Sequence, residues 1–141
     1  MIGYLNHDEF LTIADDILIK YNKKKKQKMT ITKMIGMQNG NVILKKDKLY
    51  YMNMKGNMYQ VNLSNGRQKK IISIGEIEKI KIDNEGTRTD MTVNYSKDYI
   101  IIDTYLNFGQ KNITRKLLIF NYKGEKQEKK NYNLYFYIPG S

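Results

Sequence analysis

The pattern of hydrophobic and polar positions divides the chain into a short N-terminal segment with helical spacing and a long remainder that alternates like strands. Between residues 7 and 22, apolar side chains recur at intervals of three and four, which would place them on one stripe of an α-helix. The stripe consists of Phe10, Ala14, Ile17 and Tyr21. Asn6 suits the N-cap of such a helix, and Glu9 would complete a capping box. The pattern predicts one amphipathic helix over about residues 7–22, with this stripe as its packing face.

After this segment, short apolar runs separated by turn residues indicate strands over about residues 29–138. Asn39-Gly40, for example, is a typical hairpin turn. The expected strands are residues 29–34, 41–46, 49–54, 58–63, 70–74, 76–83, 91–95, 99–106, 115–122 and 132–138. No low-complexity linker divides the 141 residues, so we expect a single domain over residues 1–141. The predicted fold class is α+β, with a single N-terminal amphipathic helix packed on an antiparallel β meander.

The net charge of +11 raises the question of an anionic partner. All but three of the 25 basic residues are lysine, whereas arginine is the side chain preferred for reading phosphates and base edges. A run of four lysines follows the predicted helix and is the candidate for a weak, non-specific contact with DNA or a wall polymer. The run consists of Lys23, Lys24, Lys25 and Lys26. A solvated surface is the simpler interpretation, and little DNA binding is expected at physiological salt.

The sequence offers little catalytic chemistry. It contains no cysteine, which excludes thiol nucleophiles and thiolate metal sites, and its single histidine, His7, has no neighbouring nucleophile. Asp83, Glu85 and Asp90 could supply oxygen ligands, but their spacing departs from that of a calcium loop. We therefore expect no catalytic residues, no cofactor and no metal, and a small hydrolase or lyase is a remote alternative.

Three segments resemble the soluble part of bacterial minor type IV pilins, competence minor pilins and J-type pseudopilins: residues 7–22, 41–51 and 71–82. The resemblance implies a non-enzymatic structural subunit that assembles with other pilin subunits at the cell surface. An upstream helix, absent from this sequence, would anchor the precursor in the membrane. If Met1 is the native start, a cytoplasmic location is expected instead, because residues 1–5 do not form a signal peptide.

An internal echo supports a different hypothesis. Residues 58–68 and 117–127 both contain an apolar run, an asparagine (Asn62 and Asn121), a glycine turn, a basic residue and a glutamine. This pattern resembles the outer strands of blades in TolB-like and LRP-like β-propellers. The resemblance implies a partial β-propeller binding module, two to three blades of a larger assembly. It would also require residues 17–22 to form a strand.

Overall fold

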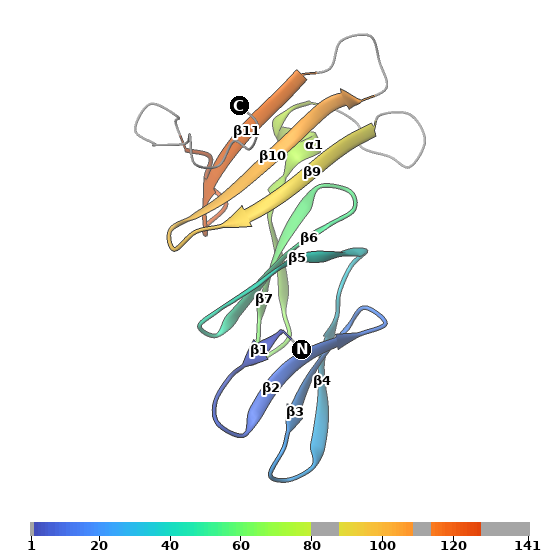
Figure 1. Ribbon diagram of the computed structural model, residues 1–141, viewed down its shortest axis with the longest axis vertical. Coiled ribbons are helices and arrows are strands. Elements are labelled where there is room, and N and C mark those ends of the chain that lie inside the picture. The colour runs from blue at the N-terminus through green and yellow to red at the C-terminus, as the bar shows by residue number, and fades with distance from the viewer. Residues whose placement is uncertain (1, 80–87, 109–113, 128–141) are drawn as a thin grey trace.

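The structure, a computed structural model, describes residues 2–79, 88–108 and 114–127, and in these residues the fold is built almost entirely from antiparallel strands (Figure 1). The first sheet has the order β1 (Gly3–Tyr4), β2 (Glu9–Ala14), β3 (Ile17–Asn22) and β4 (Gln27–Lys33). The second sheet has the order β5 (Met37–Lys45), β6 (Lys48–Asn53), β7 (Asn57–Asn62) and β8 (Gln68–Ser73). The third contains β9 (Arg88–Tyr95), β10 (Tyr99–Phe108) and β11 (Thr114–Asn121), with β10 in the centre. In the described part of the chain, the longest helix is the four-residue α1 (Ile74–Ile77).

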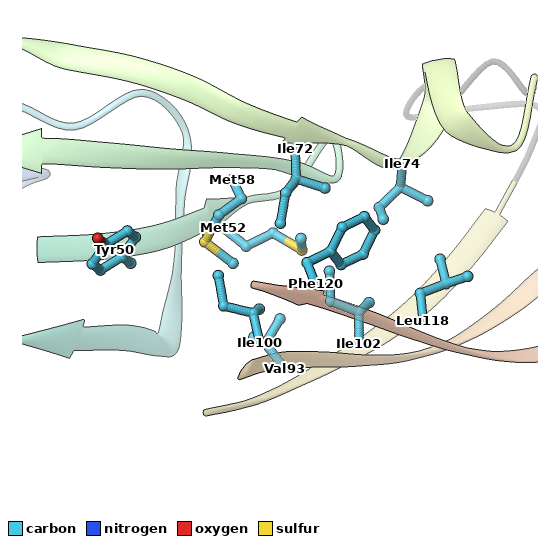
Figure 2. Close-up of a cluster of buried hydrophobic side chains, with 10 residues drawn as sticks. All are labelled: Tyr50, Met52, Met58, Ile72, Ile74, Val93, Ile100, Ile102, Leu118 and Phe120. Carbon is cyan, nitrogen blue, oxygen red and sulfur yellow. The ribbon is translucent and has the colours of Figure 1, made fainter. Parts of the chain in front are cut away.

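Each sheet is a meander in which every strand pairs with its predecessor, and the three sheets follow one another in space in sequence order (Figure 1). One hydrophobic core joins the first and second sheets and contains Leu11, Leu18, Leu49, Tyr51 and Val61. The other joins the second and third sheets (Figure 2). Its buried members are Tyr50, Met52, Met58, Ile72, Ile74, Val93, Ile100, Ile102, Leu118 and Phe120.

Successive sheets approach each other at their first strands. β5 contacts β9, and a Cβ added to Gly3 of β1 would lie 3.2 Å from Leu44 Cδ2 of β5. Antiparallel meanders that pack face to face and converge at their first strands have the arrangement of propeller blades. The all-β architecture contradicts the predicted α+β class and the pilin resemblance, because both depend on a long N-terminal helix.

The predicted helix is wrong because residues 9–22 form the β2–β3 hairpin. Phe10 pairs with Tyr21 and Ala14 pairs with Ile17, so the four residues assigned to a helical stripe lie on one face of a hairpin. Asp15 and Asp16 form the connection, with φ of 52° and 64°, the two positive values that a type I′ turn requires. A spacing of four, three and four is symmetric about this turn, so it fits both structures.

The predicted cap is also reassigned. Asn6 Oδ1 accepts hydrogen bonds from the backbone N–H groups of Asp8 (2.9 Å) and Glu9 (3.0 Å), as a helix cap would, but these bonds close the turn that leads into β2. The strands predicted between residues 29 and 122 are largely confirmed, but Asn39-Gly40 lies within β5. The strand predicted over residues 76–83 is wrong in its described part, where residues 74–77 form α1, and residues 80–83 lie outside the described residues. The strand predicted over residues 132–138 lies outside the described residues.

The turn that follows the third strand begins in a similar way in all three sheets. Asn22, Asn62 and Asn121 end their strands, and each Oδ1 accepts a backbone N–H from the following turn: Lys25 at 2.9 Å, Ser64 at 2.9 Å and Lys123 at 3.0 Å. The echo between Asn62 and Asn121 is therefore structural, and it extends to the first sheet. Asn22 and Asn62 are 40 positions apart (62 − 22), within the range of propeller-blade repeats, whereas Asn62 and Asn121 are 59 positions apart (121 − 62).

One residue of each turn has a left-handed backbone: Lys26 (φ 51°), Gly66 (φ 73°) and Gly124 (φ 87°). The two glycines form the joints between sheets, because Gly66 lies against the carbonyl of Ile31 in β4 and Gly124 against the carbonyl of Ile71 in β8. A Cβ at either glycine would overlap the carbonyl oxygen. In the first sheet the left-handed residue is a lysine, Lys26, whose Cβ would meet a carbonyl placed as in the other two turns.

Candidate functional site: the basic end of the first sheet

A pocket of about 350 Å³ lies at the end of the first sheet, beside the β3–β4 turn. Its walls come from β2, β3, β4 and the turn itself, and they are lined by Glu9, Lys20, Asn22, Lys25, Gln27, Lys28 and Met29. Lys20 pairs with Leu11 in the register and with Met29 across the next strand, so these residues share the face that packs on the second sheet. The pocket thus continues this face beyond the apolar core.

Lys20, Lys25 and Glu9 set the charge of the pocket, whereas the strand register places the side chain of the third lining lysine, Lys28, on the opposite face of the sheet. Lys20 Nζ lies 3.5 Å from Glu9 Oε2, and Asn6 Nδ2 donates a 2.8 Å hydrogen bond to Glu9 Oε1. The hydrogen bond from Asn6 lowers the pKa of Glu9, and the charge of Lys20 lowers it further. Partial desolvation opposes these effects without cancelling them. With Glu9 ionised, Lys20 and Lys25 leave a net charge of +1 (2 − 1), which is complementary to a phosphate-type anion.

The four candidate lysines occupy the β3–β4 turn, so the prediction that they follow a helix is wrong. All four are exposed, and the backbone N–H groups of Lys23 and Lys25 are hydrogen-bonded. Lys23 N–H donates to the Asp8 carbonyl at 2.8 Å, and Lys25 N–H donates to Asn22 Oδ1 at 2.9 Å. These lysines are thus carried by an ordered turn, and Lys25 is part of the pocket wall.

The residues assigned to a helical packing face lie on the opposite side of the same sheet. Phe10, Ala14, Ile17 and Tyr21 face away from the core between the first and second sheets, since they alternate with Leu11 and Leu18. Phe10 and Tyr21 are half-buried, and their ring centroids are 5.2 Å apart. These residues form an outer apolar face in the described structure.

The remaining candidates are not brought together. His7 Nδ1 lies 3.2 Å from Asp8 Oδ1 with its side chain 97% exposed, and it caps no helix. Asp83 and Glu85 lie outside the described residues, and Asp90 belongs to β9. Within residues 2–79, 88–108 and 114–127, no group of three or more acidic, histidine or cysteine side chains could hold a metal ion.

Sequence reasoning missed Lys20, Gln27 and Lys28 as partners of the lysine run. Their proximity depends on the β2–β3–β4 pairing, in which Asn22 meets Gln27 and Lys20 meets Met29. The signal that could have found them is the pair Asn22 and Gln27, which repeats the asparagine–glutamine echo of the later sheets.

The described part of the chain contains no helix that is long and apolar enough to cross a membrane. No family model matches the sequence, and no curated protein matches it. Among solved structures, the crystal structure of the tricorn protease aligns with a TM-score of 0.43 and 16% identity. The alignment covers 84% of this chain and 11% of that one, so the chain spans about a ninth of the length of that protein. Nothing in these comparisons resembles a pilin, and they assign the chain to no family.

Proposed function

We propose that the chain is a non-catalytic binding module made of propeller-type sheets and that the basic end of its first sheet binds polyanions. The observation that carries the proposal is the pocket lined by Lys20 and Lys25 beside a single carboxylate, with Lys28 on the strand that borders it. Asn22 and Gln27 add amide groups that can donate hydrogen bonds to phosphate or sulfate oxygens. The overall charge of +11 would favour the approach of such a ligand.

The absence of catalysis is part of the proposal. The exposed His7 has Asp8 as its near neighbour and lies on the turn before β2. Binding through lysine would instead be electrostatic and salt-dependent, because ammonium groups release condensed counterions from a polyanion.

The test is a calorimetric titration with inorganic polyphosphate at about 50, 100 and 200 mM salt. The double variant Lys25→Gln/Lys28→Gln removes the charges of two residues that line the pocket, and the control Lys55→Gln/Lys69→Gln removes two exposed charges from the second sheet. Since each exposed contact contributes up to about 1 kcal/mol, we expect the pocket variant to bind roughly tenfold more weakly, with a shallower salt dependence. The control should remain close to the parent protein.

Glu9→Gln tests the same site in the opposite direction. It removes the carboxylate that pairs with Lys20, so polyphosphate affinity should rise severalfold. Equal losses in the pocket and control variants would show that only net charge matters and would refute the pocket. The absence of polyphosphate binding by the parent protein at about 50 mM salt would refute the proposed function.

A further inference from the structure

Three aromatic side chains and a lysine form a row across all four strands of the first sheet. In the strand register Tyr4 lies opposite Phe10, Phe10 opposite Tyr21, and Tyr21 opposite Lys28, so all four point to the same face. The ring centroids of Tyr4 and Phe10 are 5.9 Å apart, and those of Phe10 and Tyr21 are 5.2 Å apart. We call these three rings the aromatic row.

The aromatic row is open to solvent at one end and has an ammonium group at each end. Tyr4 is 53% exposed, and Lys23 Nζ lies 4.9 Å from the centroid of its ring. Lys28, at the other end, is exposed and also lines the rim of the basic pocket. Tyr122 in the third sheet has a similar ammonium contact with Lys45, but it packs on Tyr50 of the apolar core.

Another sheet of this protein is a poor occupant for the face that carries the aromatic row. At both joints between sheets, a glycine in the turn after the third strand of one sheet lies against a strand carbonyl of the preceding sheet. At the corresponding place the first sheet has Lys26, whose Cβ would overlap such a carbonyl. The lysines around the row would in addition have to be desolvated under a covering sheet.

We infer that the aromatic row is a stacking platform for single-stranded nucleic acid. This inference rests on the proposed polyanion binding and names its ligand class. Exposed aromatic rings on a sheet stack unpaired bases, and neighbouring lysines neutralise the phosphates between them. A single strand can place bases on Tyr4 and its neighbours while its phosphates meet Lys23 and Lys28. A duplex keeps its bases stacked internally and cannot use the rings in this way.

The test is fluorescence anisotropy with a labelled thymidine 15-mer at about 50 mM salt, in parallel with the polyphosphate titration. Tyr4→Ala removes the most exposed ring, and Tyr4→Phe retains it. Met54→Ala, at a 63% exposed position in the turn between β6 and β7, is the matched control for loss of surface area. We expect Tyr4→Ala to bind the oligonucleotide about 5- to 100-fold more weakly, and Tyr4→Phe and Met54→Ala to bind like the parent protein.

The outcomes separate the two proposals. Unchanged oligonucleotide binding by Tyr4→Ala, or equal binding of a duplex with the same number of phosphates, would overturn stacking and leave the polyanion site intact. A parent protein that binds neither probe would overturn both proposals. If light scattering shows that the parent protein self-associates and Tyr4→Ala abolishes this, the face is a protein interface and the inference is wrong. Loss of oligonucleotide binding in Tyr4→Ala with unchanged polyphosphate binding would support it.

Discussion

Gly66→Ala should destabilise the protein far more than an ordinary surface substitution, because Gly66 forms the joint between the first two sheets. Gly66 has φ of 73°, and the new methyl group would overlap the carbonyl oxygen of Ile31 in β4. The strand or the turn would have to move, at the expense of the packing that joins the two sheets. Gly36→Ala is the matched control, since Gly36 has φ of 57° but its nearest neighbour, Asn53 Cβ, would be 3.9 Å away.

The comparison of the two variants separates backbone strain from the lost contact. An alanine in a left-handed conformation lowers the free energy of unfolding by roughly 1–2 kcal/mol. Alanine also restricts the unfolded chain more than glycine does, and this raises the free energy of unfolding by about 0.4–1 kcal/mol. Gly36→Ala should therefore lower the free energy of unfolding by about 1 kcal/mol. Overpacking against a fixed backbone adds about 1–3 kcal/mol, so Gly66→Ala should lower it by about 2–4 kcal/mol.

Urea denaturation followed by circular dichroism measures both values. The free energy of unfolding falls by about 1–3 kcal/mol for each 1 M of urea. The additional loss of stability in Gly66→Ala should therefore lower its urea midpoint by roughly 1 M relative to Gly36→Ala. Gly124→Ala, which meets the Ile71 carbonyl, should behave like Gly66→Ala. If Gly66→Ala and Gly36→Ala are equally stable, the turn does not form the joint, and the argument that Lys26 leaves the first sheet uncovered fails with it.

Two further predictions concern the first hairpin and a buried tyrosine. Replacing Asp15-Asp16 by Asn-Gly should raise the free energy of unfolding by roughly 0.5–1 kcal/mol, because both positions have positive φ. If these residues formed a helix, the glycine would instead lower the free energy of unfolding by about 1 kcal/mol. A lower urea midpoint would therefore contradict the hairpin. Burial raises the pKa of Tyr95 well above its usual 10, and the nearby Tyr122 adds a smaller increase. As the pH rises, Tyr95 therefore ionises in the unfolded chain before it ionises in the folded protein. Its contribution to the free energy of unfolding is complete below about pH 10 and is lost as the pH rises further. Urea midpoints from pH 8 to 11 should show this loss, and a Tyr95→Phe variant that loses stability just as steeply would contradict it.

The alternating segments after residue 27 could be predicted from sequence, whereas the N-terminal element could not. In β6 and β7, β-branched and aromatic residues between clear turns admit only strands. Residues 9–22 satisfy two periodicities, and the decision depends on the Asp15-Asp16 turn and on a second sheet that covers Leu11 and Leu18. The polar Asn39-Gly40 pair shows the reverse case, since it lies in an irregularity of β5 between the pairs Met37–Asn53 and Val42–Tyr51 instead of ending the strand.

The candidate site divides in the same way. Lysines 23–26 were identifiable as a charged run, but their partners are brought to them by the strand register. Tyr4, Phe10 and Tyr21 are separated by six and eleven positions and share no local pattern. They become neighbours only because three strands place them opposite one another, and such an alignment cannot be read before the pairing is known.

Lys26 connects the fold of the first sheet with its chemistry. A left-handed backbone costs a lysine roughly 1–2 kcal/mol more than a glycine. The two later sheets have glycine in the left-handed position of this turn. In those sheets the small residue is required by the carbonyl against which it packs. In the first sheet the left-handed residue is Lys26, which is exposed and belongs to the same turn as Lys25 of the pocket wall. The type of turn that joins sheets elsewhere in the molecule carries a run of exposed lysines in the first sheet, and the proposed polyanion binding would use one of them, Lys25, directly.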